Sequence, residues 1–240
     1  MPRIFDNIDQ SLLPALRETL NLAGRADFCV GYFNLRGWKQ IDEYIEGWAG
    51  GPGQCCRLLV GMQRLAQDQL RDALSILYNG EGIDNATALH LKKKLAEEFR
   101  PQLMLGTPTN QDEVGLRRLA AQIKGKKVIV KLYLRHPLHA KLYLLFRPDP
   151  ISPTVGFLGS SNLTFAGLSQ QGELNVDVVD QDACQKLARW FEDRWEDRWC
   201  VDISGELVEI IEQSWAPEEP LPRYYVYLKM AYQPSERVAA

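Results

Sequence analysis

The feature that most restricts the fold of this sequence is a series of short apolar runs separated by segments of helical periodicity. The apolar run over residues 27–33 predicts a buried strand, and a second strand is predicted over residues 56–61. Large apolar residues recur at helical spacing over residues 36–48, between these two strands. Two strands joined through a helix pair in parallel, because a parallel pair needs a long crossover connection. The sequence therefore predicts an α/β fold.

The rest of the chain continues this pattern of helices and strands. Residues 65–124 have helical periodicity throughout, which predicts a helical insertion in the fold. Further helices are predicted over residues 8–22, 65–78, 86–103, 113–124, 181–199 and 204–215, and further strands over residues 128–134, 139–146, 155–158 and 173–179. We expect one domain over residues 1–215, with a mixed, largely parallel sheet flanked by helices.

The end of the sequence differs in character from this domain. Residues 216–223 read APEEPLPR, a proline-rich composition that is typical of a linker. Residues 224–240 begin an apolar pattern that stops without a closing element. We expect them to lead into a further downstream region, and the alternative is a frayed tail.

Composition limits the class of protein and the chemistry open to it. The sequence contains no run of about 20 apolar residues that could span a membrane, and its first residues lack the apolar core of a signal peptide. The five cysteines form no CxxC pair, and none of the three histidines stands at a metal-site spacing from a cysteine. We therefore expect a cytoplasmic protein with reduced thiols and with no bound metal or cofactor.

The net charge of −3 conceals an uneven distribution of charge. Residues 117–147 contain nine Lys or Arg and no acid, whereas residues 173–219 contain fourteen acids and four bases. A basic segment of this kind favours a polyanionic partner. The alternative is two oppositely charged surfaces of a single domain.

The first candidate for chemistry is the pair His139 and Lys141 in the predicted strand over residues 139–146. Residues i and i+2 of a strand project from the same face, so an imidazole and an ammonium would enter one site together. This pair suits a phosphodiester, since histidine can attack or carry a proton and lysine can bind a phosphate oxygen. His90 and Lys92 have the same spacing but fall in a predicted helix, where they diverge by about 200°.

The second candidate is the turn Gly159-Ser160-Ser161-Asn162, followed by Glu173 and Asn175 in the next predicted strand. Glycine at a strand end permits close approach of a ligand, and serine and asparagine can donate to phosphate oxygens. A following carboxylate can orient a histidine ring. The structural alternatives are an ordinary Ser/Asn turn or helix cap and a surface glutamate on an edge strand.

Taken in order, His139, Lys141, Gly159, Ser160, Asn162 and Glu173 resemble the HxK and GSxN motifs of the phospholipase D superfamily. The chain is also similar to the phospholipase-D-like domain that precedes bacterial superfamily-2 helicase regions, although no Walker motif occurs in it. The pattern departs from the family at Phe146, where the family carries an Asp, and Asp149 is the nearest acid beyond it.

The resemblance implies a metal-independent reaction in two steps, in which one histidine attacks phosphorus and a second protonates the leaving oxygen. Because the chain has one HxK motif, an active form is expected to be a homodimer with both His139 side chains at the two-fold axis. Lys141 and Asn162 would bind phosphate oxygens, supported by Ser160, and Glu173 would orient His139. The other expected substrate contacts are Gly159, Ser161 and Asn175.

The expected substrate is nucleic acid, with DNA and endonuclease activity favoured over the competing lipid phosphodiester. The basic residues expected to contact its backbone are Lys124, Lys126, Lys127, Lys131 and Arg135, and the alternative is that alternate members of their strand simply face solvent. Two other classes of function remain: a catalytically weak docking domain of a helicase or ATPase, which Phe146 would favour, and a structural dimerisation module.

Overall fold

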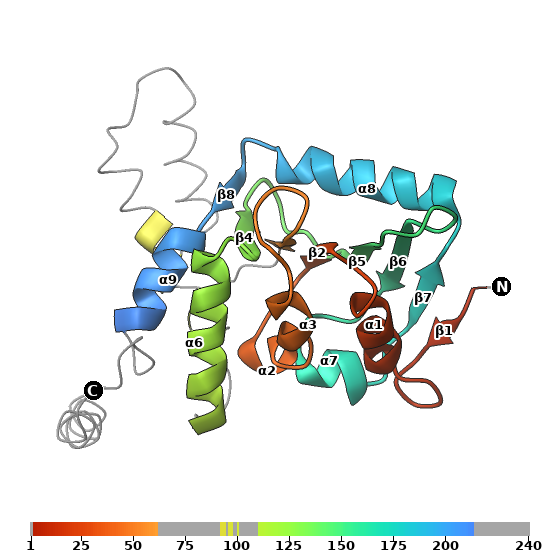
Figure 1. The fold of residues 1–240 in the computed structure, drawn as a ribbon, viewed down its shortest axis with the longest axis horizontal. Helices are drawn as coiled ribbons and strands as arrows, with labels where there is room; N and C mark the ends of the chain where they lie inside the picture. Colours follow the sequence, from red (N-terminus) through yellow and green to blue (C-terminus); the bar gives the residue numbers. More distant parts are fainter. Residues whose placement is uncertain (1, 62–91, 95, 98–99, 101–109, 214–240) are drawn as a thin grey trace.

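The computed structural model describes residues 2–61, 92–94, 96–97, 100 and 110–213, which form an eight-stranded sheet in the order β1-β7-β6-β5-β2-β3-β4-β8 (Figure 1). The strands are β1 (Ile4–Phe5), β2 (Arg25–Val30), β3 (Cys56–Val60), β4 (Val128–Tyr133), β5 (Lys141–Phe146), β6 (Thr154–Gly159), β7 (Asn175–Val178) and β8 (Cys200–Asp202). The helices are α1 (Leu12–Leu20), α2 (Leu35–Trp38), α3 (Asp42–Glu46), α6 (Asn110–Lys124), α7 (Phe165–Ser169), α8 (Gln181–Trp195) and α9 (Ser204–Gln213).

The sheet is mixed, as predicted, but it is not largely parallel. In the described part of the chain β2 pairs in parallel with β3, and β3 with β4. The other neighbouring pairs are antiparallel. The prediction assumed that the parallel pairing of the first crossover continues through the whole sheet. The connection between β5 and β6 is too short for a crossover and permits only an antiparallel hairpin.

The two faces of the sheet bury two apolar clusters. Figure 1 shows α8 along one face and α1, α2, α3 and α7 along the other. The α8 side packs Phe191 and Trp195 against Leu142 and Leu144 of β5. The opposite side contains the larger cluster, which includes Tyr143, from the same strand. The alternation of faces along β5 is that expected of a strand covered on both sides.

Buried charge joins α8 to the sheet. The side chain of Asp27 in β2 is 1% exposed and accepts hydrogen bonds from Arg57 of β3, with Nε to Oδ1 at 2.7 Å. Arg57 also pairs with Glu192 of α8 at 2.7 Å and lies over the ring of Trp195. Since a lone buried carboxylate is costly, these pairs fix α8 against the sheet at the position of Glu192.

The predicted helix over residues 36–48 is two short helices, α2 and α3, because Ile41 leaves the helical conformation with a φ of −133°. Gly37 of α2 packs directly on the loop before α7: a Cβ at this position would lie 2.3 Å from the carbonyl oxygen of Leu163. The strands β1 and β8 were not predicted, since two and three residues carry no periodic signal.

Other predicted elements fall outside the part of the chain that the structure describes. These are the helix over residues 65–78, most of the helix over 86–103, and the linker and tail over 216–240. The last helix of the predicted insertion is present as α6. No helix in the described ranges has the length and apolar character needed to cross a bilayer.

Candidate active site

The register of three antiparallel strands brings the predicted motifs together. Lys141, the first residue of β5, lies opposite Gly159, the last residue of β6. Gly159 in turn lies opposite Asn175, the first residue of β7. The HxK segment, the GSSN turn and the segment that starts at Glu173 therefore meet at one edge of the sheet, which is also the carboxyl edge of β2, β3 and β4.

His139 lies just before β5 rather than within it, so the predicted strand started two residues too early. The segment that carries it crosses the end of β3, where the N–H of Leu138 donates to the carbonyl oxygen of Gly61 at 3.2 Å. A Cβ on Gly61 would lie 2.5 Å from that of Leu138, so glycine permits the crossing. His139 is exposed.

Lys141 is buried, with 2% of its surface exposed, and its Nζ donates to the carbonyl oxygen of His139 at 2.8 Å. Burial lowers the pKa of this lysine from its ordinary value, while the nearby Cys29 and Glu173 act in the opposite direction. Burial also raises the pKa of the Cys29 thiol to about 12. The ammonium therefore stands in a poorly solvated place, where its charge acts strongly on a bound anion.

Asn162 is oriented by the backbone at the end of β2. Its Oδ1 accepts from the N–H groups of Gly31 and Tyr32, at 3.0 and 2.9 Å. These two bonds use the amide oxygen and leave Nδ2 as a donor for a ligand. Asn162 was predicted from the sequence, whereas Gly31 and Tyr32 were not, because they contribute backbone N–H groups that residue type does not reveal.

Ser160 and Glu173 form a pair at the exposed rim of the site. The hydroxyl of Ser160 donates to Oε2 of Glu173 and accepts from the N–H of Leu174 at 3.0 Å. Within the described part of the chain, Glu173 makes this bond to Ser160 and none to the His139 ring. The expected orientation of His139 by Glu173 stays a prediction.

Ser161 and Asn175 are both buried and are hydrogen-bonded to each other. Ser161 donates its N–H to Oδ1 of Asn175 at 3.2 Å, and the asparagine Nδ2 returns a bond to the serine hydroxyl at 2.8 Å. The hydroxyl of Tyr143 donates to the carbonyl oxygen of Ser161 at 2.9 Å. These bonds hold the GSSN turn in place, and the expected substrate contacts of Ser161 and Asn175 stay predictions.

Gly159 is also explained by its neighbour in the sheet. A Cβ at this position would lie 2.2 Å from the carbonyl oxygen of Leu174 and 2.5 Å from Oδ1 of Asn175. The approach of β7 therefore requires glycine at this position, and the expected close approach of a ligand stays a prediction.

The predicted basic surface is divided by the fold. Lys124, Lys126 and Lys127 precede β4 and so lie at the amino edge of the parallel strands, opposite His139. Lys124 pairs there with Glu212 of α9 and Lys127 with Glu46 of α3.

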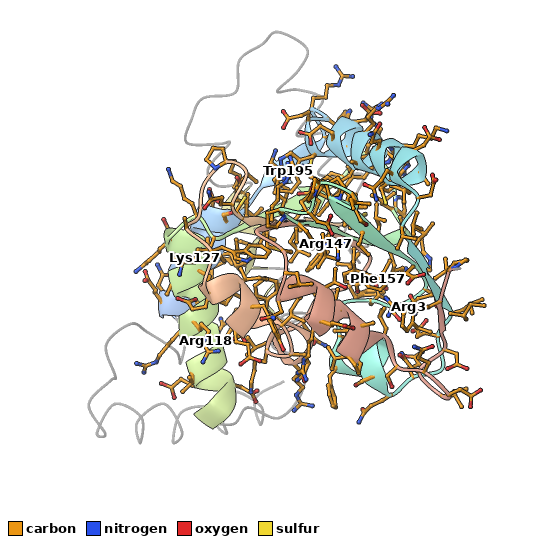
Figure 2. All side chains as sticks on the ribbon, turned by 45° about the vertical axis from the view of Figure 1, so that its right-hand side comes forward. Arg3, Arg118, Lys127, Arg147, Phe157 and Trp195 are labelled. Carbon is orange, nitrogen blue, oxygen red and sulfur yellow. The ribbon has the colours of Figure 1, made fainter. Side chains whose placement is uncertain are left out.

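The remaining two basic residues also differ in position. Lys131 faces α8, where its Nζ donates to the carbonyl oxygen of Trp195 at 3.0 Å. Lys127 lies in a different part of the molecule from Trp195, as Figure 2 shows. Arg135, which follows β4, lies at the same edge as His139 and pairs with Asp197 at 2.8 Å. The fold therefore separates the first four of these residues from the edge that carries His139, and their contact with a nucleic-acid backbone stays a prediction.

Phe146, which replaces the family's Asp, is the last residue of β5 and lies at the far end of that strand from Lys141. Five residues of strand separate the two by about 17 Å. The guanidinium of Arg25 lies 4.3 Å from the centre of the Phe146 ring. Asp149 caps the following turn, accepting from the N–H groups of Ile151 and Ser152 at 2.9 and 3.1 Å. Neither residue is part of the site.

This mixed sheet, with an imidazole, an ammonium and an oriented amide at one edge, defines a phospholipase-D-like protein. A family model described as "Cardiolipin synthase, PLD-like domain" matches residues 25–195, and the chain belongs to this family. No curated protein matches the sequence significantly.

Solved structures share the fold at low sequence identity. Phosphatidylserine synthase from Haemophilus influenzae Rd KW20 has a TM-score of 0.50 and 14% identity, over 99% of this chain and 46% of that one. Two others have a TM-score of 0.46 and cover 84% of this chain: Nuc, a phospholipase D family member from Salmonella typhimurium, at 10% identity over 97% of its chain, and NucT from Helicobacter pylori, at 13% over 98%.

The glycine at the end of β6 can be tested by adding one methyl group. Gly159→Ala is expected to lower the free energy of unfolding by about 1–3 kcal/mol, because β7 must move to admit the Cβ. The matched control is Gly172→Ala, whose Cβ would meet only Ile8, at 3.7 Å, and whose effect should stay within about 0.5 kcal/mol. Urea denaturation measures both, and equal losses would contradict the packing explanation.

The buried lysine predicts a pH-dependent stability. Since the pKa of Lys141 is lower in the folded state, the unfolded chain binds more protons and the stability of the protein rises with pH as this lysine deprotonates. Lys141→Met should be more stable than the parent at pH 7, and the difference should shrink as pH approaches the unfolded value of about 10.4. Lys186→Met, on the exposed face of α8, is the control and should show no such trend.

Proposed function

We propose that the protein is a metal-independent phosphodiesterase that cleaves nucleic acid, with DNA favoured, through a phosphohistidine on His139. The observation that carries the proposal is the meeting of His139, Lys141 and Asn162 at one edge of the sheet. The exposed imidazole of His139, the buried ammonium of Lys141 and the Nδ2 donor of Asn162 lie at this edge. These groups can bind a phosphate diester and attack its phosphorus without a metal.

In the first step a ring nitrogen of His139 attacks phosphorus, a P–N bond forms and the P–O bond to the leaving group breaks. The leaving oxygen takes a proton from a second imidazole, for which we propose His139 of the partner subunit. Nζ of Lys141 and Nδ2 of Asn162 bind the non-bridging oxygens. In the second step water attacks phosphorus, gives its proton to the second imidazole and displaces His139.

The nucleic-acid substrate and the homodimer are part of this proposal, as is a link to a helicase-type ATPase through the chain beyond residue 215. Of the bases over residues 117–147, Lys141 and Arg135 lie at the same edge as His139, which supports a polyanionic substrate. The feature that favoured a non-catalytic docking domain was Phe146, and that residue lies at the other end of β5 from the chemistry.

The proposal predicts cleavage of labelled single- or double-stranded DNA in the presence of EDTA. His139→Ala should slow cleavage by about 10²–10⁴-fold, because it removes the attacking group, and Lys141→Ala by about 10²–10³-fold, because it removes charge from the phosphate oxygens. The matched control is His136→Ala: this nearby histidine packs edge-on against Tyr133 and should leave the rate unchanged.

Full activity in both His139→Ala and Lys141→Ala would contradict the proposal, and so would activity that requires added Mg²⁺. Phospholipid vesicles serve as the second substrate in the same assay. Cleavage of phospholipid with DNA left intact would keep the chemistry and overturn the nucleic-acid assignment.

The shared site makes a separate prediction about mixed dimers. If both His139 side chains serve one reaction, a subunit with His139→Ala inactivates its wild-type partner. After subunits exchange at equal amounts and constant total protein, activity should fall to about a quarter of the wild-type value, against about half for independent sites. Measured rates at several mixing ratios distinguish a squared from a linear dependence, and a linear one would contradict the shared site.

A further inference from the structure

We propose that Tyr32 is the base-binding side chain of this site, and that its ring stacks on the nucleobase next to the cleaved phosphate. The substrate is then a single strand, whose bases are free to leave their neighbours. This inference rests on the proposed function and specifies its substrate more closely.

The position of Tyr32 places it at the edge where the motifs meet. It comes two residues after the end of β2, whose last registered pair with β5 joins Cys29 to Leu142. The N–H of Gly61 donates to the carbonyl oxygen of Val30 at 2.9 Å, and Gly61 is also the residue that the His139 segment crosses. The end of β2 therefore lies between the segments that carry His139 and Asn162, and Tyr32 comes directly after it.

The backbone of Tyr32 is fixed on both sides. Its N–H donates to Oδ1 of Asn162 at 2.9 Å, and its carbonyl oxygen accepts from the N–H of Leu163 at 3.1 Å. Phe33 continues the contact as a parallel bridge to Leu163. The backbone that carries the Tyr32 ring is therefore fixed, and it is hydrogen-bonded directly to Asn162, whose amide we propose binds the phosphate.

The side chain itself is accessible, in contrast to its surroundings. Between Val30 and Leu35, Tyr32 is the single residue that is not buried. Three other aromatic residues near this edge, Phe33, Tyr133 and Tyr143, are 1%, 3% and 1% exposed. Within the described part of the chain, the hydroxyl of Tyr32 is neither among the buried unsatisfied groups nor engaged in a hydrogen bond.

An accessible aromatic ring beside a phosphate-binding group suits a nucleotide. Aromatic side chains bind single strands by stacking on the bases, with little preference for sequence. Bases in a duplex are already stacked on their neighbours, so the same contact there first requires an unstacking step. A phospholipid diester offers no aromatic surface for this contact.

The test compares an oligonucleotide with the same strand carrying a stable abasic residue beside the cleaved phosphate. Tyr32→Ala should raise KM for the intact strand by about 10- to 100-fold, as expected for the loss of one stacked base, with kcat little changed. On the abasic strand the variant and the wild type should have equal KM. Tyr32→Phe keeps the ring and should retain the difference in KM between the intact and the abasic strand.

An equal loss on intact and abasic strands would overturn the inference, because it would show that Tyr32 acts through the position of Asn162. An unchanged KM on both would overturn it as well, and so would cleavage of duplex as efficient as that of single strand. If the wild type cleaves nothing, the proposed function fails. Binding of the intact and abasic strands to wild type and Tyr32→Ala then tests the base contact separately, and equal affinities would overturn it.

Discussion

The hydrogen-bonded register of β5, β6 and β7 is the constraint on which the candidate site depends. It sets Lys141, Gly159 and Asn175 in one row, and the segments that carry His139, Asn162 and Glu173 extend from that row. Because side chains alternate along a strand, a slip of one residue would move each member of the row to the opposite face. The apolar residues that alternate on β5, Leu142 and Leu144 on one side and Tyr143 on the other, oppose such a slip.

The site combines exposed and buried polar groups, with different consequences for stability. His139 and Ser160 are exposed and cost the fold little. Lys141 is buried and its pKa is lowered, so the folded state carries an ammonium in a place that disfavours charge. Asn175 and Tyr143 compensate in part, since their hydrogen bonds to Ser161 make the surrounding turn rigid. The fold therefore gives up some stability to hold this lysine at the edge of the sheet.

The sequence was sufficient for the motif residues and for most elements, but not for their relations in space. The strands over 56–61 and 128–134 were predicted from their apolar runs within one residue of β3 and β4. The antiparallel pairing of β5 with β2, and the separation of Lys127 from His139, depend on which strands pair in the sheet. Local periodicity gives no information about that pairing. Ser161 and Asn175 were predicted from their residue types as ligand contacts, but their burial and their mutual hydrogen bonds could not be predicted from residue type.

The packing of Gly37 on Leu163 couples helix α2 to the loop before α7. Gly37 lies in α2, and Leu163 directly follows Asn162 in the loop before α7. Since backbone touches backbone at this point, no flexible side chain is present to absorb a displacement. A shift of α2 is transmitted to the amide of Asn162, so this helix and the edge of the sheet that carries Asn162 move together or not at all.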